Sequence, residues 1–119
     1  IEPLNPFDAP DFFLPTPTIG FGLTRIVDHP NIAVEYDIYH AQRTEGNIIW
    51  TLEQYIDRIG HIQLADSPGR MEPGTGELNF ANISSAIDRL GYTDRIGLEY
   101  KPSKADTNET LTWMKEFVG

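Results

Sequence analysis

The sequence predicts an α/β fold in which four consecutive strand–helix units share one parallel sheet. The first observation is the order of elements, because short β-branched or aromatic runs alternate with segments that carry apolar residues at helical spacing. The second is that long loops follow the strands, whereas the connections from each helix to the next strand are short. This asymmetry is typical of (β/α) barrels, whose functional residues lie at the carboxyl ends of the strands.

The first unit consists of a strand end, a proline-rich loop and a helix. The run Ile1-Glu2-Pro3-Leu4 reads as the end of a strand already under way, so we expect the 119-residue chain to be a fragment, a processed chain or an engineered product. Residues 5–18 carry several prolines and cannot form a regular element. Three phenylalanines in this loop predict that it packs over a site. A helix is then predicted over residues 18–28.

The second unit is defined by a turn signal, an apolar strand and a long amphipathic helix. A β-branched and aromatic run predicts a strand over residues 31–39. The helix is predicted over residues 44–58, with Thr44 as its N-cap and Gly60 as the residue that ends it.

The last two units repeat this pattern. A strand over residues 61–65 leads into a second long loop, residues 67–76, and then into a helix capped by Asn79 or Asn82. The final unit is predicted to contain a strand over residues 95–100 and a helix over residues 107–118.

Four such units make half of an eight-stranded (β/α)8 TIM barrel, and residues 1–119 are predicted to form this single half-barrel domain. Helices on one side of the sheet would leave its other face bare, and we expect Val34, Ala65 and Gly97 to face water there. The half-barrel is therefore expected to associate with a missing amino-terminal half or with itself.

The composition excludes several classes of function. A net charge of −9 argues against binding to nucleic acid and to anionic membrane surfaces, both of which favour clustered lysine and arginine. The chain has no cysteine, which excludes disulfides and thiolate metal sites. No apolar run approaches the roughly 18 residues of a membrane span, and we expect a cytoplasmic protein.

One acid or amide lies inside each of the four predicted strands. These residues are Glu2, Asp37, Gln63 and Glu99. A buried carboxylate is costly unless a partner compensates for it, and parallel neighbouring strands would bring all four side chains to one point. Three carboxylates and one amide oxygen suit a hard divalent cation.

Other interpretations of these residues stay open at the level of sequence. Glu2 fits an exposed acid at a strand end, Asp37 fits the cap of a turn, and Gln63 fits a satisfied core amide. Glu99 fits a structural acid, and His61 fits a core histidine two residues deeper than Gln63.

Several motifs together resemble the carboxyl-terminal half of the hydroxypyruvate isomerases, which are xylose-isomerase-like TIM barrels. The resemblance covers nearly the whole chain, with the loops in step. The motifs are Ile1-Glu2-Pro3-Leu4-Asn5, Tyr36-Asp37-Ile38-Tyr39-His40-Ala41-Gln42, His61-Ile62-Gln63-Leu64-Ala65-Asp66, Pro73-Gly74-Thr75-Gly76-Glu77-Leu78-Asn79 and Glu99-Tyr100-Lys101-Pro102.

The resemblance implies a role for each candidate residue. It implies Mg²⁺ or Mn²⁺ as the cofactor, held by Glu2, Asp37, Gln63 and Glu99, with Glu2 and Glu99 also acting as the acid/base pair. It further implies that His40 and Arg70 bind the substrate. From the residues alone, His40 also fits a histidine bonded to the backbone, and Arg70 a solvated loop charge.

The activity implied by the resemblance is an aldose–ketose isomerisation of a small hydroxy-oxo acid. The leading reaction converts hydroxypyruvate to tartronate semialdehyde (2-hydroxy-3-oxopropanoate) through an enediolate. The alternatives are a non-catalytic half-barrel that serves as an assembly module, a 2-oxo-tetronate isomerase, and a ketose 3-epimerase or nuclease of the same superfamily. The negative net charge disfavours the nuclease.

Overall fold

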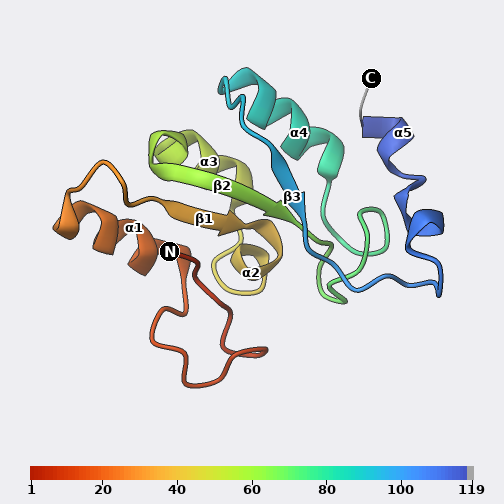
Figure 1. Cartoon of the computed structure of the whole chain (residues 1–119), viewed down its shortest axis with the longest axis horizontal. Helices are drawn as coiled ribbons and strands as arrows, with labels where there is room; N and C mark the ends of the chain where they lie inside the picture. The colour runs from red at the N-terminus through yellow and green to blue at the C-terminus, as the bar shows by residue number, and fades with distance from the viewer. Residues whose placement is uncertain (118–119) are drawn as a thin grey trace.

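Three parallel strands form one open sheet in the computed structural model, which describes residues 1–117 (Figure 1). The strands are β1 (Val34–Asp37), β2 (Ile59–Leu64) and β3 (Ile96–Leu98), and they lie in the order β1-β2-β3. The register pairs Asp37 with Gln63, and Gln63 with Gly97. Two of the predicted site residues are therefore neighbours across the sheet.

Helices connect the strands and cover one face of the sheet. They are α1 (Pro17–Val27), α2 (Ile38–Gln42), α3 (Ile48–Tyr55), η1 (Ile56–Arg58), α4 (Phe80–Arg89), η2 (Thr107–Leu111) and α5 (Met114–Phe117). One apolar cluster joins side chains of β1 and β2 to side chains of α1, α2, α3 and α4. Because side chains alternate along a strand, residues on this face are apolar and those on the other face are free to be polar.

Alternation overturns one expectation for the bare face of the sheet. Val34 and Tyr36 belong to the core against the helices, and so do Ile62 and Leu64 of β2. Val34 was expected to face water and is fully buried, because it lies an odd number of residues before Asp37 and so points to the helical side. Ala65 is also fully buried, so its expected exposure was wrong as well.

The first segment pairs with β1 but is not a formed strand. The Ile1 amino group donates to the Ala33 carbonyl at 2.8 Å, and the Glu35 N–H donates to the Ile1 carbonyl at 2.8 Å. These two bonds are the pattern of a parallel bridge between Ile1 and Val34. Pro3 has no N–H with which to continue the ladder, so the first predicted strand is reduced to this contact.

The helix boundaries differ from the predictions where local capping decides them. The predicted strand 31–39 ends at Asp37, whose side chain accepts the Tyr39 N–H and begins α2. Thr44 was the predicted N-cap of the next helix, but α3 has Asn47 at that position. Gly60 lies inside β2 rather than at the end of a helix.

In the carboxyl-terminal half, the first helix agrees with its prediction, whereas the strand predicted over residues 95–100 is shortened to Ile96–Leu98. Asn79 caps α4 by accepting the Asn82 N–H, as predicted. The helix predicted over residues 107–118 is divided into η2 and α5, and residue 118 lies outside the described residues. No helix among the described residues is long and apolar enough to cross a membrane.

Candidate metal centre

Polar side chains gather at the carboxyl ends of β1 and β2. Ligand atoms of Glu2, Asp37 and His40 all lie within 4.8 Å of one another. Asp37 ends β1, His40 follows in α2, and Glu2 arrives on the segment that pairs with β1. The register places Gln63 beside Asp37, on the face of the sheet opposite the helices.

Four buried polar atoms at this point have no hydrogen-bond partner among the described residues. They are Glu2 Oε1, Asp37 Oδ2, His40 Nε2 and Gln63 Oε1. Each unsatisfied buried group typically costs about 1–3 kcal/mol, so such a concentration indicates a ligand that completes the bonding. Three of the four are oxygens, which are the donor atoms that Mg²⁺ and Mn²⁺ prefer. The residues present therefore fit a hard divalent cation.

The electrostatics of the carboxylates agree with this fit. Burial raises the pKa of Asp37 to about 7, with smaller contributions in the same direction from Glu2 and Glu99. Burial also raises the pKa of Glu2, and the neighbouring charges of Glu35 and Glu99 add to the rise. Crowded, desolvated carboxylates of this kind are stabilised in their charged form by a nearby cation.

His40 is arranged as a hydrogen-bond donor rather than a metal ligand. Its Nδ1 accepts the backbone N–H of Asn5 at 3.1 Å and lies 2.7 Å from Asn5 Nδ2. The Asn5 Oδ1 accepts the N–H groups of Phe7 and Asp8, which orients the amide so that its NH₂ faces the imidazole. The proton of the neutral ring therefore belongs on Nε2, which lies 3.8 Å from Asp37 Oδ2. Burial lowers the pKa of His40 to about 4, so the ring is neutral at pH 7.

Arg70 reaches the same site from the loop after β2. Its guanidinium lies 2.7 Å from Glu99 Oε2, 3.7 Å from Asp37 Oδ2 and 4.0 Å from Asp8 Oδ2. It also lies over the ring of Tyr39, at 5.1 Å from the centroid. Arg70 is therefore held against the acidic residues of the site and is not a solvated loop charge.

Glu99 lies at the rim of this cluster. It follows β3, where its N–H donates to the Leu64 carbonyl at 3.1 Å. Its side chain is 53 % exposed, and its carboxylate is bonded to Arg70. The structure thus brings together Glu2, Asp37, Gln63 and His40. It places Glu99 at the rim of this group, bonded to Arg70.

Two residues of the first loop were not singled out from the sequence. Asn5 is fully buried and fixes the orientation of His40. Asp8 accepts the Tyr39 hydroxyl at 2.7 Å and the Asn5 amide at 3.3 Å. The position of Asn5 directly after the first predicted strand could have identified it as a site residue. No sequence pattern could have identified Asp8, because its contacts depend on the path of the loop.

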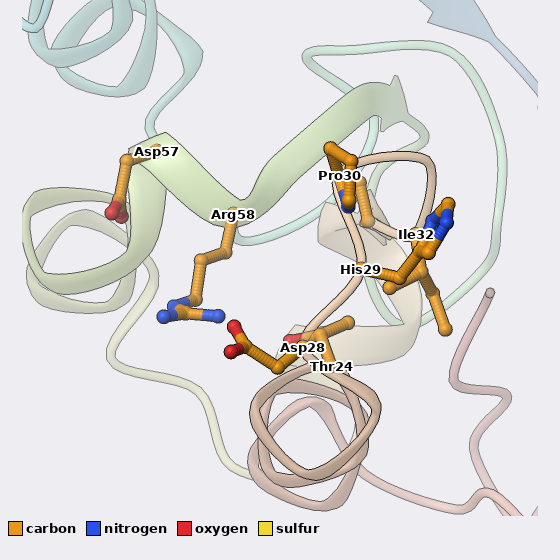
Figure 2. Close-up of a pocket in the computed structure, with 8 residues that line it drawn as sticks. Thr24, Asp28, His29, Pro30, Ile32, Asp57 and Arg58 are labelled. Carbon is orange, nitrogen blue, oxygen red and sulfur yellow. The ribbon is translucent and has the colours of Figure 1, made fainter.

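A separate pocket lies at the opposite end of the sheet. Figure 2 shows Asp28 and Arg58 directed towards one another there, between the end of α1 and the start of β2. The pocket has a volume of about 410 Å³, and His29 and Asp57 also line it. None of the predicted site residues does, and so this pocket is not part of the candidate metal centre.

The chain resembles known proteins along almost its full length. A family model described as "Xylose isomerase-like TIM barrel" matches residues 1–117. The chain is 43 % identical over 117 residues to the hydroxypyruvate isomerase of Escherichia coli (strain K12), covering 98 % of the chain and 45 % of that protein. It is 41 % identical over 119 residues to the 2-oxo-tetronate isomerase of Cupriavidus necator, covering 100 % of the chain and 45 % of that protein.

A solved structure gives the same assignment of fold. The crystal structure of "AP endonuclease, family 2" from Brucella melitensis superposes with a TM-score of 0.93 at 35 % identity, over 98 % of this chain and 45 % of that one. The chain thus spans a little under half the length of the relatives it matches, and its open sheet is part of a barrel. The chain belongs to the xylose isomerase-like TIM barrel family.

Proposed function

We propose that this chain supplies the metal-binding half of an isomerase that acts on small hydroxy-oxo acids. The reaction proposed is the interconversion of hydroxypyruvate and tartronate semialdehyde. The observation that carries the proposal is the group of buried polar atoms on Glu2, Asp37, Gln63 and His40 that no described residue satisfies. The relatives at 43 % and 41 % identity, both named as isomerases, support the reaction class.

Glu2, Asp37, Gln63 and Glu99 are proposed to hold Mg²⁺ or Mn²⁺. When bound, the ion supplies positive charge that stabilises negative charge on substrate oxygens and acidifies the adjacent C–H bond. Glu99 accepts from Arg70 through Oε2 in the structure, and its second carboxylate oxygen is proposed to bind the metal.

Glu2 and Glu99 are proposed to move the proton. The isomerisation takes a proton from one carbon and returns it to the next, with an enediolate between the two steps, while the hydroxyl proton passes from one of the two adjacent oxygens to the other. The raised pKa of Glu2 suits it to hold and release a proton closer to neutral pH than an ordinary carboxyl. Glu99 directly follows β3, the strand at the other edge of the sheet, and is proposed to serve the other carbon.

His40 and Arg70 are proposed to bind the substrate. The Nε2–H of His40 has no hydrogen-bond partner within residues 1–117 and can donate to a substrate oxygen. The guanidinium of Arg70 matches a carboxylate in charge and geometry, which suits a hydroxy-oxo acid.

The complete barrel is proposed to require a further half, because the chain covers 45 % of the isomerases it matches. The experiment therefore joins this chain to the amino-terminal half of the E. coli relative and supplies Mg²⁺. Hydroxypyruvate, a 2-oxo-tetronate and a ketose are tested as substrates. Turnover of the ketose alone would contradict the proposal.

The roles of the two glutamates are tested in the same assembly. Glu2→Gln and Glu99→Gln should each lower kcat by roughly 10²–10⁴-fold, the usual contribution of a general acid or base. Metal affinity should fall only partly, because the amide oxygen remains a ligand. Glu109→Gln, an exposed acid in η2, is the matched control. Full turnover in either glutamate variant would refute its role.

A second candidate, 2-oxo-tetronate isomerisation, rests on the 41 % identity to the Cupriavidus necator protein. The same substrates separate the two reactions by their kcat/KM values. A non-catalytic half-barrel would show no turnover even in the joined barrel. Light scattering gives the oligomeric state of the 119-residue chain, and a monomer could not close a barrel by itself.

A further inference from the structure

Asp66 is a buried acid that the proposed mechanism does not use. It lies two residues after β2 and three after Gln63, and it is only 1 % exposed. We propose that Asp66 is a positioning residue that places Arg70 over the site. This inference rests on the substrate-binding role proposed for Arg70.

The carboxylate of Asp66 connects the two ends of the loop that carries Arg70. Its Oδ1 accepts the N–H groups of Ser67 at 2.9 Å and Leu78 at 3.1 Å. Its Oδ2 accepts those of Gly74 at 2.9 Å and Gly76 at 2.8 Å. Because these four bonds use both oxygens, Asp66 is bound to the loop and is not available as a ligand for the metal.

The backbone of Arg70 depends on the same residue. The Arg70 N–H donates to the Asp66 carbonyl at 2.9 Å, and the Asp66 N–H donates to the Met71 carbonyl at 2.8 Å. Arg70 has a φ of 56°, in the left-handed region that residues other than glycine rarely occupy. Such a conformation persists only where the surrounding structure holds it.

The loop after β3 holds Arg70 from the other side. The Lys101 N–H donates to the Arg70 carbonyl at 2.7 Å, and the buried carboxylate of Glu72 accepts the N–H of Ser103 at 3.0 Å. The ordered backbone brings the guanidinium to Glu99 and Asp37. Asp66 thus acts on the site only through the position of Arg70.

Asp66→Asn is the sharpest test, because it preserves the shape of the side chain. An amide has one acceptor oxygen, and its NH₂ group would oppose N–H groups that the carboxylate now accepts. In the joined barrel, we expect KM for hydroxypyruvate to rise about tenfold, a loss of one substrate contact. The decrease in kcat should be smaller. The affinity for Mn²⁺ should stay within about twofold, because the substitution removes no ligand of the metal.

A double-mutant cycle separates positioning of Arg70 from a general loss of structure. If Asp66 acts through Arg70, Asp66→Asn should add nothing to the KM of Arg70→Ala. Additive effects, an unchanged KM or an equal fall in Mn²⁺ affinity would overturn the proposal. The matched control is Asp88→Asn, at an exposed position of α4, which should leave all three quantities unchanged.

Two further measurements keep the proposal testable if Asp66→Asn does not fold or the barrel is inactive. Gly74→Ala retains Asp66 but strains the backbone of the same loop, because Gly74 has a φ of 93° and there is open space around it. This substitution should raise KM by less than Asp66→Asn does. In the 119-residue chain, NMR of the Arg70 guanidinium should show its bond to Glu99 weakened by Asp66→Asn. An unchanged Arg70 signal overturns this inference, whereas failure to turn over any hydroxy-oxo acid overturns only the proposed function.

Discussion

Asp37 combines a structural and a chemical role through its two oxygens. Oδ1 accepts the Tyr39 N–H at 2.8 Å and starts α2, whereas no described residue forms a hydrogen bond with Oδ2. The two interpretations that the sequence left open, a turn cap and a site residue, are therefore compatible. One carboxylate fixes the path of the chain and presents its other oxygen to the site.

The raised pKa of Asp37 predicts how stability responds to pH in the absence of metal. Between the ordinary value of 3.8 and the folded value of about 7, the native state binds more protons at Asp37 than the unfolded state. The free energy of unfolding should therefore contain a contribution that falls as pH rises through this window, in total roughly a few kcal/mol.

The prediction is tested with Asp37→Asn. In EDTA, urea denaturation at pH 4.5, 6 and 8 should show this variant gaining stability relative to the parent chain as pH rises. The comparison of the two chains isolates the contribution of Asp37 from those of the other titratable groups. Asp57→Asn, at an exposed position, should give the parental slope. A constant difference between Asp37→Asn and the parent would contradict the prediction.

The sequence was sufficient to predict which residues gather but not how the loops hold them. Glu2, Asp37 and Gln63 meet because each lies near a strand end on the same face, and strand alternation is readable in sequence. The contacts of Asn5 with His40 join residues 35 positions apart through an irregular loop. No periodicity encodes such a path.

At the scale of elements, the loop between β2 and α4 is held by four hydrogen bonds to the Asp66 carboxylate. The sequence predicted residues 67–76 as a long loop rich in glycine and proline, without indicating its internal contacts. The structure shows that the close approach at Gly76 has a physical cause, since a Cβ there would lie 2.1 Å from the Ser67 carbonyl and 2.6 Å from Asp66 Oδ1.

Gly76→Ala should therefore destabilise the chain. The added methyl group must displace backbone, and we expect a loss of about 2–4 kcal/mol in the free energy of unfolding, measured by urea denaturation. Gly22→Ala in α1 is the contrasting substitution, because its methyl group would meet no described atom within 4 Å apart from the neighbouring residues and backbone of its own helix. There we expect a gain of about 0.5–1 kcal/mol from helix propensity. Equal changes in the free energy of unfolding at the two glycines would contradict the close backbone approach inferred at Gly76.

The predicted boundaries of helices and strands were wrong where a capping residue ended an element that the apolar pattern continues. Apolar spacing placed α1, α3 and α4 within a few residues, since it reports directly on the buried face. The helical start at Ile38 was missed because the residues after Asp37 continue a β-branched and aromatic pattern, and only the Asp37 cap ends the strand. The missing first strand has a similar local cause in Pro3.

At the scale of the whole molecule, the candidate ligands come from separate parts of the chain. Glu2 precedes β1, Asp37 ends β1, Gln63 lies in β2 and Glu99 follows β3. A bound ion would therefore connect every strand of the sheet, and it can bind only when the strands are in place.

Divalent metal should accordingly stabilise the folded state. A ligand at 100 times its Kd adds about 2.7 kcal/mol to the free energy of unfolding, which raises Tm by several degrees in a domain of this size. We expect this rise with Mg²⁺ or Mn²⁺ over EDTA, and a much smaller one after Asp37→Asn. Light scattering of the same samples reports whether self-association accompanies it. A flat response of the parent chain to both metals would count against a formed site.

The buried oxygens of the site also bear on how this sequence tolerates change. Glu2 Oε1, Asp37 Oδ2 and Gln63 Oε1 are kept from water without a hydrogen bond to any described residue, so each weakens the metal-free fold that contains it. Apolar side chains at Glu2 and Gln63 should make the metal-free half-barrel more stable, whereas an apolar residue at Asp37 would also remove the cap of α2. The same oxygens are the candidate ligands for a cation, so a substitution that stabilises the metal-free half-barrel at these positions should weaken or remove the candidate metal centre.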